Sequence, residues 1–159
     1  MLSKKEALHK MHTSIDIAND IAKAMGVMGE IALSGVIFGH LPSGKNNYRI
    51  GERGMFKNQK VLAYEQIFYP QMNLLKTKAK YKLEETKRSP VYALVANIFF
   101  RDMRRDVDTI LFCDLLQKSG VIGNDRSIRV KILFGVQVDP KNPRIEFILL
   151  KLKEAPNEM

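Results

Sequence analysis

The sequence predicts a mixed α/β or α+β fold, with a small mixed sheet of about four strands and helices flanking it. A ten-residue run at 91–100 has the composition of a buried strand. Segments with helical and strand-like patterns alternate along the chain, which is typical of layered α and β structure. A chain of 159 residues with 45% hydrophobic content is long enough to bury one core. We therefore expect one domain, preceded by an extra helix.

The first 28 residues predict an amphipathic helical arm ahead of a domain formed by residues 29–159. Ser3 and Glu6 have the spacing of a capping box. Apolar side chains then recur every three or four positions until Gly26. They are Leu8, Met11, Ile15, Ala18, Ala22 and Met25. Such a stripe fits a seam between two copies of the chain, and it fits equally well a helix laid against its own sheet.

The following segments predict a strand, a turn and a longer helix. Residues 30–39 are apolar with two glycines, as in a first strand, and residues 40–47 have the composition of a turn. A helix is predicted from Lys57 to about Leu75, and Pro70 either kinks or ends it. Its apolar face consists of Val61, Tyr64, Ile67 and Phe68. The basic run at 76–88 is typical of a solvated connector and also suits contacts to phosphates.

The second half of the chain alternates between strand and helix patterns. The strand at 91–100 is followed by a short helix at 109–118 and by a tight link at 121–125. Two further strands are predicted at 128–138 and 144–152. Because a proline-containing turn joins these last two strands, we expect them to pair as an antiparallel hairpin.

The charge balance points to a polyanionic partner. The formal net charge is +9 and the isoelectric point is near 9.7, which favours nucleic acid over an acidic membrane surface. A lone cysteine, Cys113, cannot form a disulfide within the chain, so a reducing, cytoplasmic setting is expected. Its apolar neighbours suggest a small buried side chain rather than a nucleophile. No uninterrupted apolar run of 18 residues occurs, so we expect no membrane span.

Two aspartates one residue apart form the strongest candidate for a chemical site. Asp106 and Asp108 follow the predicted strand at 91–100. In extended chain, side chains at i and i+2 point the same way, so both carboxylates converge. Converging carboxylates repel each other unless a cation lies between them, and oxygen ligands suit Mg²⁺ or Mn²⁺. Arg104 and Arg105 bring positive charge to the same place, so the pattern predicts a metal site that acts on a phosphodiester.

Several segments of the second half, with support from the first half, match a known family pattern. In the second half the segments are Arg104 to Asp108, Leu115 to Gly120, Val121 to Asp125 and Pro143 to Phe147. In the first half they are Leu33 to Phe38, Pro42 to Asn46, and Phe56-Lys57 at the start of a predicted helix that contains Tyr64. Together they resemble the RusA family of Holliday junction resolvases over about residues 31–153. The segment from the Asp-x-Asp pair to Asn124-Asp125 is the most specific part. Residues 1–28 lie outside the resemblance.

The resemblance implies a Mg²⁺-dependent endodeoxyribonuclease, with Mn²⁺ as a possible substitute. Carried over by position, the catalytic and metal-binding residues are Asp106, Asp108 and Asp125. The family's acidic pair reads Asn124-Asp125 here, so one acid is replaced by an amide. The family also has a lysine in the helix after the Asp-x-Asp pair, where this sequence has residues 109–113 without one.

Lys118 and Lys45 are the candidate replacements for that lysine, although neither aligns with it. Asp114 is expected to be an acid on the surface of the helix. The side chains expected to contact DNA are Lys45, Asn46, Arg101, Arg104 and Arg105. Such contacts would fix the position of the DNA backbone without reading bases.

The resemblance further implies a homodimer that cuts branched DNA, a four-way junction, by two symmetric nicks. The family is frequent in phage genomes, so the expected role is in phage recombination or DNA repair, in the cytoplasm of a bacterium or a phage-infected host. Two alternatives remain open from the sequence. One is a DNA-junction-binding protein of the same fold without catalysis, and the other is a nuclease that acts on other branched DNA.

Overall fold

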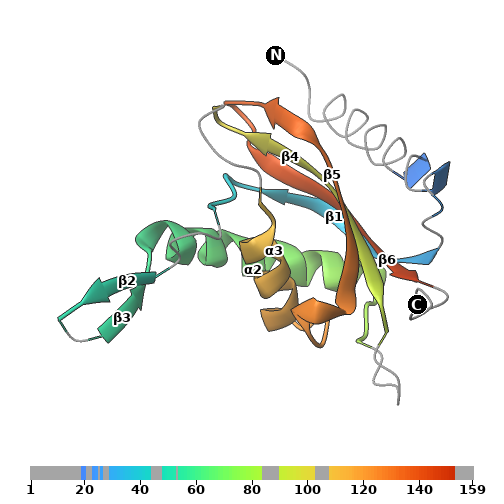
Figure 1. Cartoon of the computed structure of the whole chain (residues 1–159), viewed down its shortest axis with the longest axis horizontal. Helices are drawn as coiled ribbons and strands as arrows, with labels where there is room; N and C mark the ends of the chain where they lie inside the picture. The colour runs from blue at the N-terminus through green and yellow to red at the C-terminus, as the bar shows by residue number, and fades with distance from the viewer. Residues whose placement is uncertain are drawn as a thin grey trace.

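A computed structural model of the chain describes residues 19–20, 23–24, 26, 29–43, 48–52, 54–83, 90–102 and 108–152. These residues form a four-stranded mixed sheet, two α-helices and a separate two-stranded hairpin (Figure 1). The elements are β1 (Gly29–Phe38), β2 (Tyr48–Gly51), β3 (Gly54–Lys57), α2 (Gln59–Ala79), β4 (Tyr92–Phe100), α3 (Ile110–Lys118), the 3₁₀ turn η1 (Asp125–Ser127), β5 (Ile128–Val138) and β6 (Arg144–Leu152). The predicted fold class is confirmed. Of the predicted arm, residues 19–20 and 23–24 are helical, and most of residues 1–28 lies outside the described part.

The strand order of the sheet is β1-β6-β4-β5. β6 pairs antiparallel with both β1 and β4, whereas β4 pairs parallel with β5. Strands β1, β4 and β5 therefore run the same way and end at one side of the sheet, which we call the carboxyl edge. The opposite side, where they begin, is the amino edge.

This order corrects the predicted hairpin between residues 128–138 and 144–152. Both strands exist, but β4 lies between them and pairs with each. The turn that joins them passes over the end of β4, where the Asp139 amide donates to the Phe100 carbonyl at 2.8 Å. Every residue of β4 is buried, and a strand buried on both faces is stabilised best in the interior of a sheet, with a partner on each side.

Helix α2 packs along β1 and continues through Pro70. Its first turn is capped by the Asn58 side chain, which accepts from the Lys60 amide at 3.0 Å. The Gln71 side chain donates to the Phe38 carbonyl and accepts from the Phe38 amide, at 2.9 and 2.8 Å. A Cβ at Gly35 would lie 2.6 Å from Leu75, so glycine allows the close approach of the helix to the strand.

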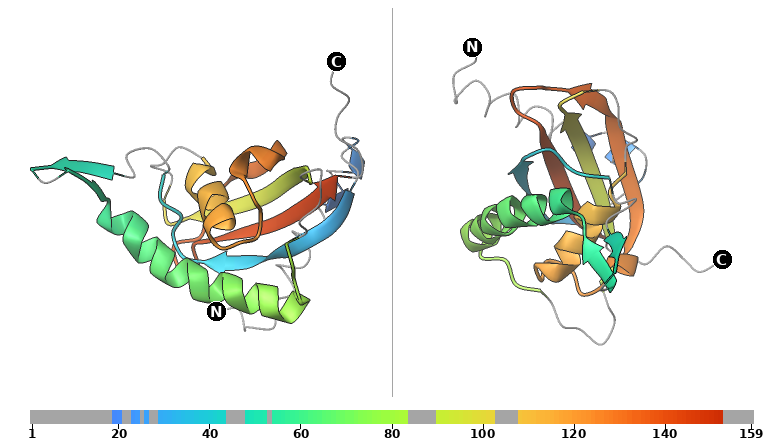
Figure 2. Two further views of the ribbon diagram at one scale, coloured as in Figure 1. Left: turned by 90° about the horizontal axis from the view of Figure 1, so that it is seen from below. Right: turned by 90° about the vertical axis from the view of Figure 1, so that its left-hand side faces the viewer.

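The main core lies between the sheet and the two helices, which cover the same face (Figure 2). Phe68 of α2, Phe112 of α3 and Phe147 of β6 meet there edge to face, with ring centroids 5.9 and 5.3 Å apart along this series. A second apolar cluster lies on the other face of the sheet. It contains Ala93, Val95, Ile148 and Leu150, each at most 2% exposed.

The β2–β3 hairpin projects away from the sheet beyond the start of α2 (Figure 1). Gly51 pairs with Gly54 across a two-residue turn, and Gly54 has a φ of 119°, which favours glycine. Ile50 in this hairpin is 89% exposed. The sequence did not predict this hairpin, because its strands are four residues long and lack a regular alternation of apolar side chains. Within the described ranges, no helix is long and apolar enough to span a bilayer.

Candidate metal and nucleic-acid site

The loops that follow β1 and β4 meet at the carboxyl edge. The Arg101 amide, just after β4, donates to His40 Nδ1, just after β1, at 3.3 Å. The His40 ring also packs edge to face on Phe100, with centroids 5.7 Å apart. Further along the same loops, the Ser43 hydroxyl donates to Asp108 Oδ2 at 2.8 Å. The carboxyl edge therefore gathers polar side chains from segments that are about 60 residues apart in sequence.

Asp108 is held at the start of α3 through both carboxylate oxygens. Oδ1 accepts from the Ile110 amide at 3.2 Å, which satisfies one of the amides left unpaired at a helix start. Oδ2 accepts from Ser43. Asp108 is half-buried, so these two donors fix its orientation while a carboxylate still has lone pairs for another ligand.

Asp125 lies beside the last turn of α3 and begins η1. Its amide donates to Gln117 Oε1 at 3.0 Å, and the Asn124 side chain caps the turn by accepting from the Arg126 amide at 2.9 Å. Asp125 is exposed. The amide at position 124 thus has a local role as the cap of this turn.

One face of α3 runs from the neighbourhood of Asp108 towards Asp125. Thr109, Cys113 and Gln117 are spaced four residues apart, so they follow one another along the helix. Beside them lies Lys131 of β5. It pairs with the core residue Leu94, and directly paired residues share a face, so Lys131 points to the side of the sheet that carries α3.

The charges around Cys113 support this placement. Burial raises the pKa of the Cys113 thiol. In smaller measure, Lys131 and the hydrogen bond with Thr109 lower that pKa, whereas the charge of Asp125 raises it. Lys131 and Asp125 are therefore both close to this face of α3. Cys113 itself is 3% exposed, which confirms that it is a small buried side chain.

Lys118 and Asp114 form an ion pair on the surface of α3, with Lys118 Nζ 2.9 Å from Asp114 Oδ2. Their side chains are 37% and 42% exposed. Asp114 is thus the surface acid that the sequence predicts. Lys118 is engaged by this pair at the far end of the helix from Asp108, which weakens its case as a replacement for the family's lysine.

The remaining predicted site residues are placed as follows. Arg101 is exposed at the carboxyl edge. Asp106, Arg104, Arg105, Lys45 and Asn46 lie outside the described residues. In the part of the chain that the structure describes, no three or more histidine, cysteine or acidic side chains group as metal ligands. The three-aspartate site stays a prediction, because its first member, Asp106, is not described.

The described donors fit a hard divalent cation in chemical type. Mg²⁺ prefers carboxylate oxygen and usually keeps several waters, so it needs few protein ligands. Asp108 offers an oriented carboxylate, and Ser43 supports it in the way that second partners orient metal ligands. Asp125 offers an exposed carboxylate at the other end of the same helix.

Arg144 also lies at the carboxyl edge, but its guanidinium is already engaged. It bonds Glu146 and Asp139, each at 2.9 Å, and stacks over Phe99 with its carbon 3.7 Å from the ring centre. Burial acts to raise the pKa of Asp139. The hydrogen bonds from Arg144 and from the Asn142 amide, together with the positive charge of Arg144, outweigh burial, so the pKa of Asp139 is lowered. Arg144 thus closes the turn after β5 instead of facing a ligand.

Sequence reasoning missed Ser43 and Lys131 as site residues. Ser43 lies 65 positions from Asp108, so only the strand order brings them together. Lys131 had a usable signal, because it alternates in β5 with Val130 and Ile132, which pack on the other face. Alternation alone does not say which face of the sheet Lys131 occupies, because that depends on how β5 pairs with its neighbour.

Comparison with known proteins leaves the family open. No protein-family model matches the chain, and no curated protein matches it.

Proposed function

We propose that the protein is a Mg²⁺-dependent endonuclease that resolves four-way DNA junctions by paired symmetric nicks. The observation that carries the proposal is the hydrogen bond from Ser43 to Asp108. It joins the loop after β1 to the start of α3 and orients one aspartate of the Asp-x-Asp pair. Proteins orient metal-binding carboxylates with partners of this kind.

Three further features support a DNA substrate. The sequence resembles the RusA family from the Asp-x-Asp pair to Asp125. The net charge of +9 favours a polyanion. Strand β1 and the parallel pair β4 and β5 end together at the carboxyl edge, and ligands of sheets with parallel strands commonly bind beyond such ends.

In this proposal Asp106 and Asp108 hold the cation at the start of α3, and Asp125, which the resemblance adds as a third ligand, lies beside the last turn of that helix. When bound, Mg²⁺ would activate water and neutralise charge on the phosphate. Ser43 keeps the Asp108 carboxylate aimed. Exposed Arg101 contacts the DNA backbone near the cut. Lys131 supplies the positive charge that the family's helix carries as a lysine, here from the neighbouring strand.

A homodimer fits this reaction, since two symmetric nicks need two identical sites related by a two-fold axis. The amphipathic pattern of residues 1–28 would extend the interface in such a dimer. Deleting those residues and measuring the mass in solution tests this part, and an unchanged dimer would remove the arm from the interface.

A second candidate is a junction-binding protein that does not cut DNA. It is favoured by the positions of the two described aspartates, because Asp108 lies at the start of α3 and Asp125 lies beside its last turn. A binder needs the fold and its positive charge but does not need the acids to share a metal.

The deciding experiment incubates the protein with an end-labelled four-way junction, with Mg²⁺ or with EDTA. Paired nicks at symmetric positions that need Mg²⁺ support the proposal. A shifted junction band without cleavage supports the binder instead. Flaps and replication forks of the same arm sequences test for a nuclease of wider structure preference.

A further inference from the structure

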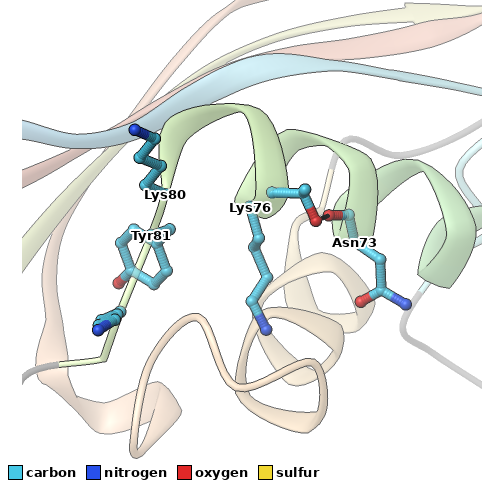
Figure 3. A pocket seen from close by; sticks show the side chains of 6 residues that line it. Asn73, Lys76, Lys80 and Tyr81 are labelled. Atoms are coloured by element: carbon cyan, nitrogen blue, oxygen red, sulfur yellow. Dashed lines mark hydrogen bonds between the residues drawn. The ribbon is translucent and has the colours of Figure 1, made fainter.

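A hollow at the end of α2 combines positive charge with an accessible volume of about 350 Å³. It is lined by Asn73, Lys76, Thr77, Lys80, Tyr81 and Lys82. Figure 3 shows Asn73 and Lys76 extending from α2 towards the loop after α3, with Tyr81 beside them. Among the residues that the structure describes, the lining contains three lysines and no acidic residue. The hollow therefore has the charge of an anion site.

The lysines of this hollow are not needed to cap the helix. The Lys80 amide donates to the Thr77 carbonyl at 3.2 Å, and the Tyr81 amide donates to the Lys76 carbonyl at 2.9 Å. This backbone arrangement is a Schellman motif, which satisfies the last carbonyls by itself. Within the described ranges, none of Lys76, Lys80 and Lys82 takes part in an ion pair. Lys76 uses one of its three ammonium donors for the Ser119 carbonyl and keeps two for a ligand.

Lys80 occupies a backbone position that favours glycine. Its φ is 49° and its ψ is 40°, in the left-handed region. Helices that end this way usually have glycine there, because a side chain in this region is disfavoured. A lysine at such a position opposes stability, and this lysine lines the hollow with Lys76 and Lys82.

The hollow is tied to the turn that leads to Asp125. Lys76 Nζ donates to the Ser119 carbonyl at 2.6 Å, and the Tyr81 hydroxyl donates to the Val121 carbonyl. Residues 119–121 end α3 and precede η1, where Asp125 lies. An anion in the hollow would thus lie on the same side of the fold as the exposed Asp125.

We propose that this hollow binds a backbone phosphate of DNA, on the arm of the junction that extends from the cutting site past Asp125. The inference rests on the proposed DNA substrate but not on cleavage. The contact is to phosphate alone, because lysine amines carry no base-specific geometry. It adds a second point of attachment at the amino edge, away from Asp108.

The test measures junction binding without divalent metal, over a series of salt concentrations. The hollow variant is Lys76→Gln/Lys82→Gln. The control variant is Lys60→Gln/Lys78→Gln, which removes the same charge from exposed positions of α2 outside the hollow. The hollow variant should lower affinity roughly tenfold and reduce the salt slope by about one for each lost phosphate contact. The control variant should change the affinity and the salt slope much less.

Because Lys76 also bonds Ser119, a second variant separates binding from folding. Lys80→Gly should keep or raise the melting temperature, since glycine suits the left-handed backbone, yet it should weaken junction binding. If Lys80→Gly lowered both the melting temperature and junction binding, Lys80 would serve stability, and the result would oppose the proposal.

The outcomes separate the two proposals. Equal losses in the hollow and control variants would reduce the effect to overall charge and overturn the phosphate site. Normal binding by the hollow variants of a protein that cuts junctions would overturn the site and leave the nuclease. Binding that depends on the hollow, without any cleavage, would retain the site and remove the nuclease. A wild-type protein that binds neither junction nor duplex would overturn both.

Discussion

The carboxyl edge and the amino edge of the sheet use polar side chains in different ways. At the carboxyl edge, side chains bond one another, as Ser43 does with Asp108 and Arg144 with Asp139. At the amino edge, Lys76 and Tyr81 bond main-chain carbonyls of the turn after α3. The contact between Ser43 and Asp108 orients a candidate metal ligand, whereas the contacts at the amino edge fix a turn and leave neighbouring charges exposed. We infer that chemistry belongs to the carboxyl edge and attachment of the substrate backbone to the amino edge.

Removing the acid at the carboxyl edge tests directly whether the chemistry belongs there. Asp108→Asn should lower junction cleavage by at least about a thousandfold, or about 4 kcal/mol in barrier, because a metal ligand is lost. Junction binding should persist, since less negative charge does not weaken phosphate contacts. Rates are measured in single turnover with Mg²⁺.

The matched control is Asp114→Asn, on the surface of the same helix. Its cleavage rate should stay within about twofold of wild type, as for most surface changes. Equal activity in both variants would remove Asp108 from the site.

The next largest effect concerns stability at the carboxyl edge. Arg144→Met should lower the free energy of unfolding by about 3–5 kcal/mol, because the buried carboxylate of Glu146, 2% exposed, would lose its ion pair with the guanidinium. Lys118→Met breaks an exposed pair with Asp114 and should cost about 0.5 kcal/mol or less. Urea denaturation measures both. A similar cost for the two variants would mean that the buried pair adds nothing beyond a surface pair.

A smaller effect is expected from the support of Asp108. Ser43→Ala removes one donor to the carboxylate and should slow cleavage roughly tenfold, with the same Mg²⁺ requirement. Ser119→Ala is the control at the amino edge, where the hydroxyl bonds the Leu116 carbonyl at 3.2 Å. Its rate should be unchanged. If the control slowed cleavage as much as Ser43→Ala, orientation of Asp108 would not explain the loss.

The smallest effect is a pH dependence of stability. The pKa of Asp139 is lowered in the folded protein from 3.8, so this group stabilises the fold above that pH. The contribution is lost as the pH falls below about 3.8 and through the folded pKa. Asp139→Asn should therefore flatten the acid side of the stability curve, measured by urea unfolding between pH 5 and 2. Identical curves would show that the turn after β5 has no part in acid unfolding.

Most elements of the fold could be predicted from local sequence patterns. The apolar run that forms β4 and the apolar face of α3 fixed those elements within one residue. Pairing could not be predicted, since alternation tells which side chains share a face but not which strand lies alongside. The predicted hairpin of the last two strands was wrong for this reason. Pro70 was expected either to kink or to end α2, and it does not end it, because the helix continues for nine residues past it, to Ala79.

The candidate site was predictable in its residue types and less so in its geometry. Asp108 and Asp125 were predicted as site residues from spacing and resemblance, and the structure places them at opposite ends of α3. The Ser43 contact depends on two loops meeting at the carboxyl edge, which local patterns do not contain. Lys131 faces α3 because β5 pairs with β4 in one register, and a shift by one residue would turn it to the other face.

The strand order also sets a constraint on how the chain is made. β6, the last strand, lies between β1 and β4, which precede it by many residues. During synthesis the first strand has no sheet partner until residues 144–152 emerge from the ribosome. Until then β1 and the uncovered side of β4 expose unpaired backbone and apolar side chains, the conditions under which nascent chains aggregate. We therefore expect the nascent protein to depend on chaperones until its last strand is available.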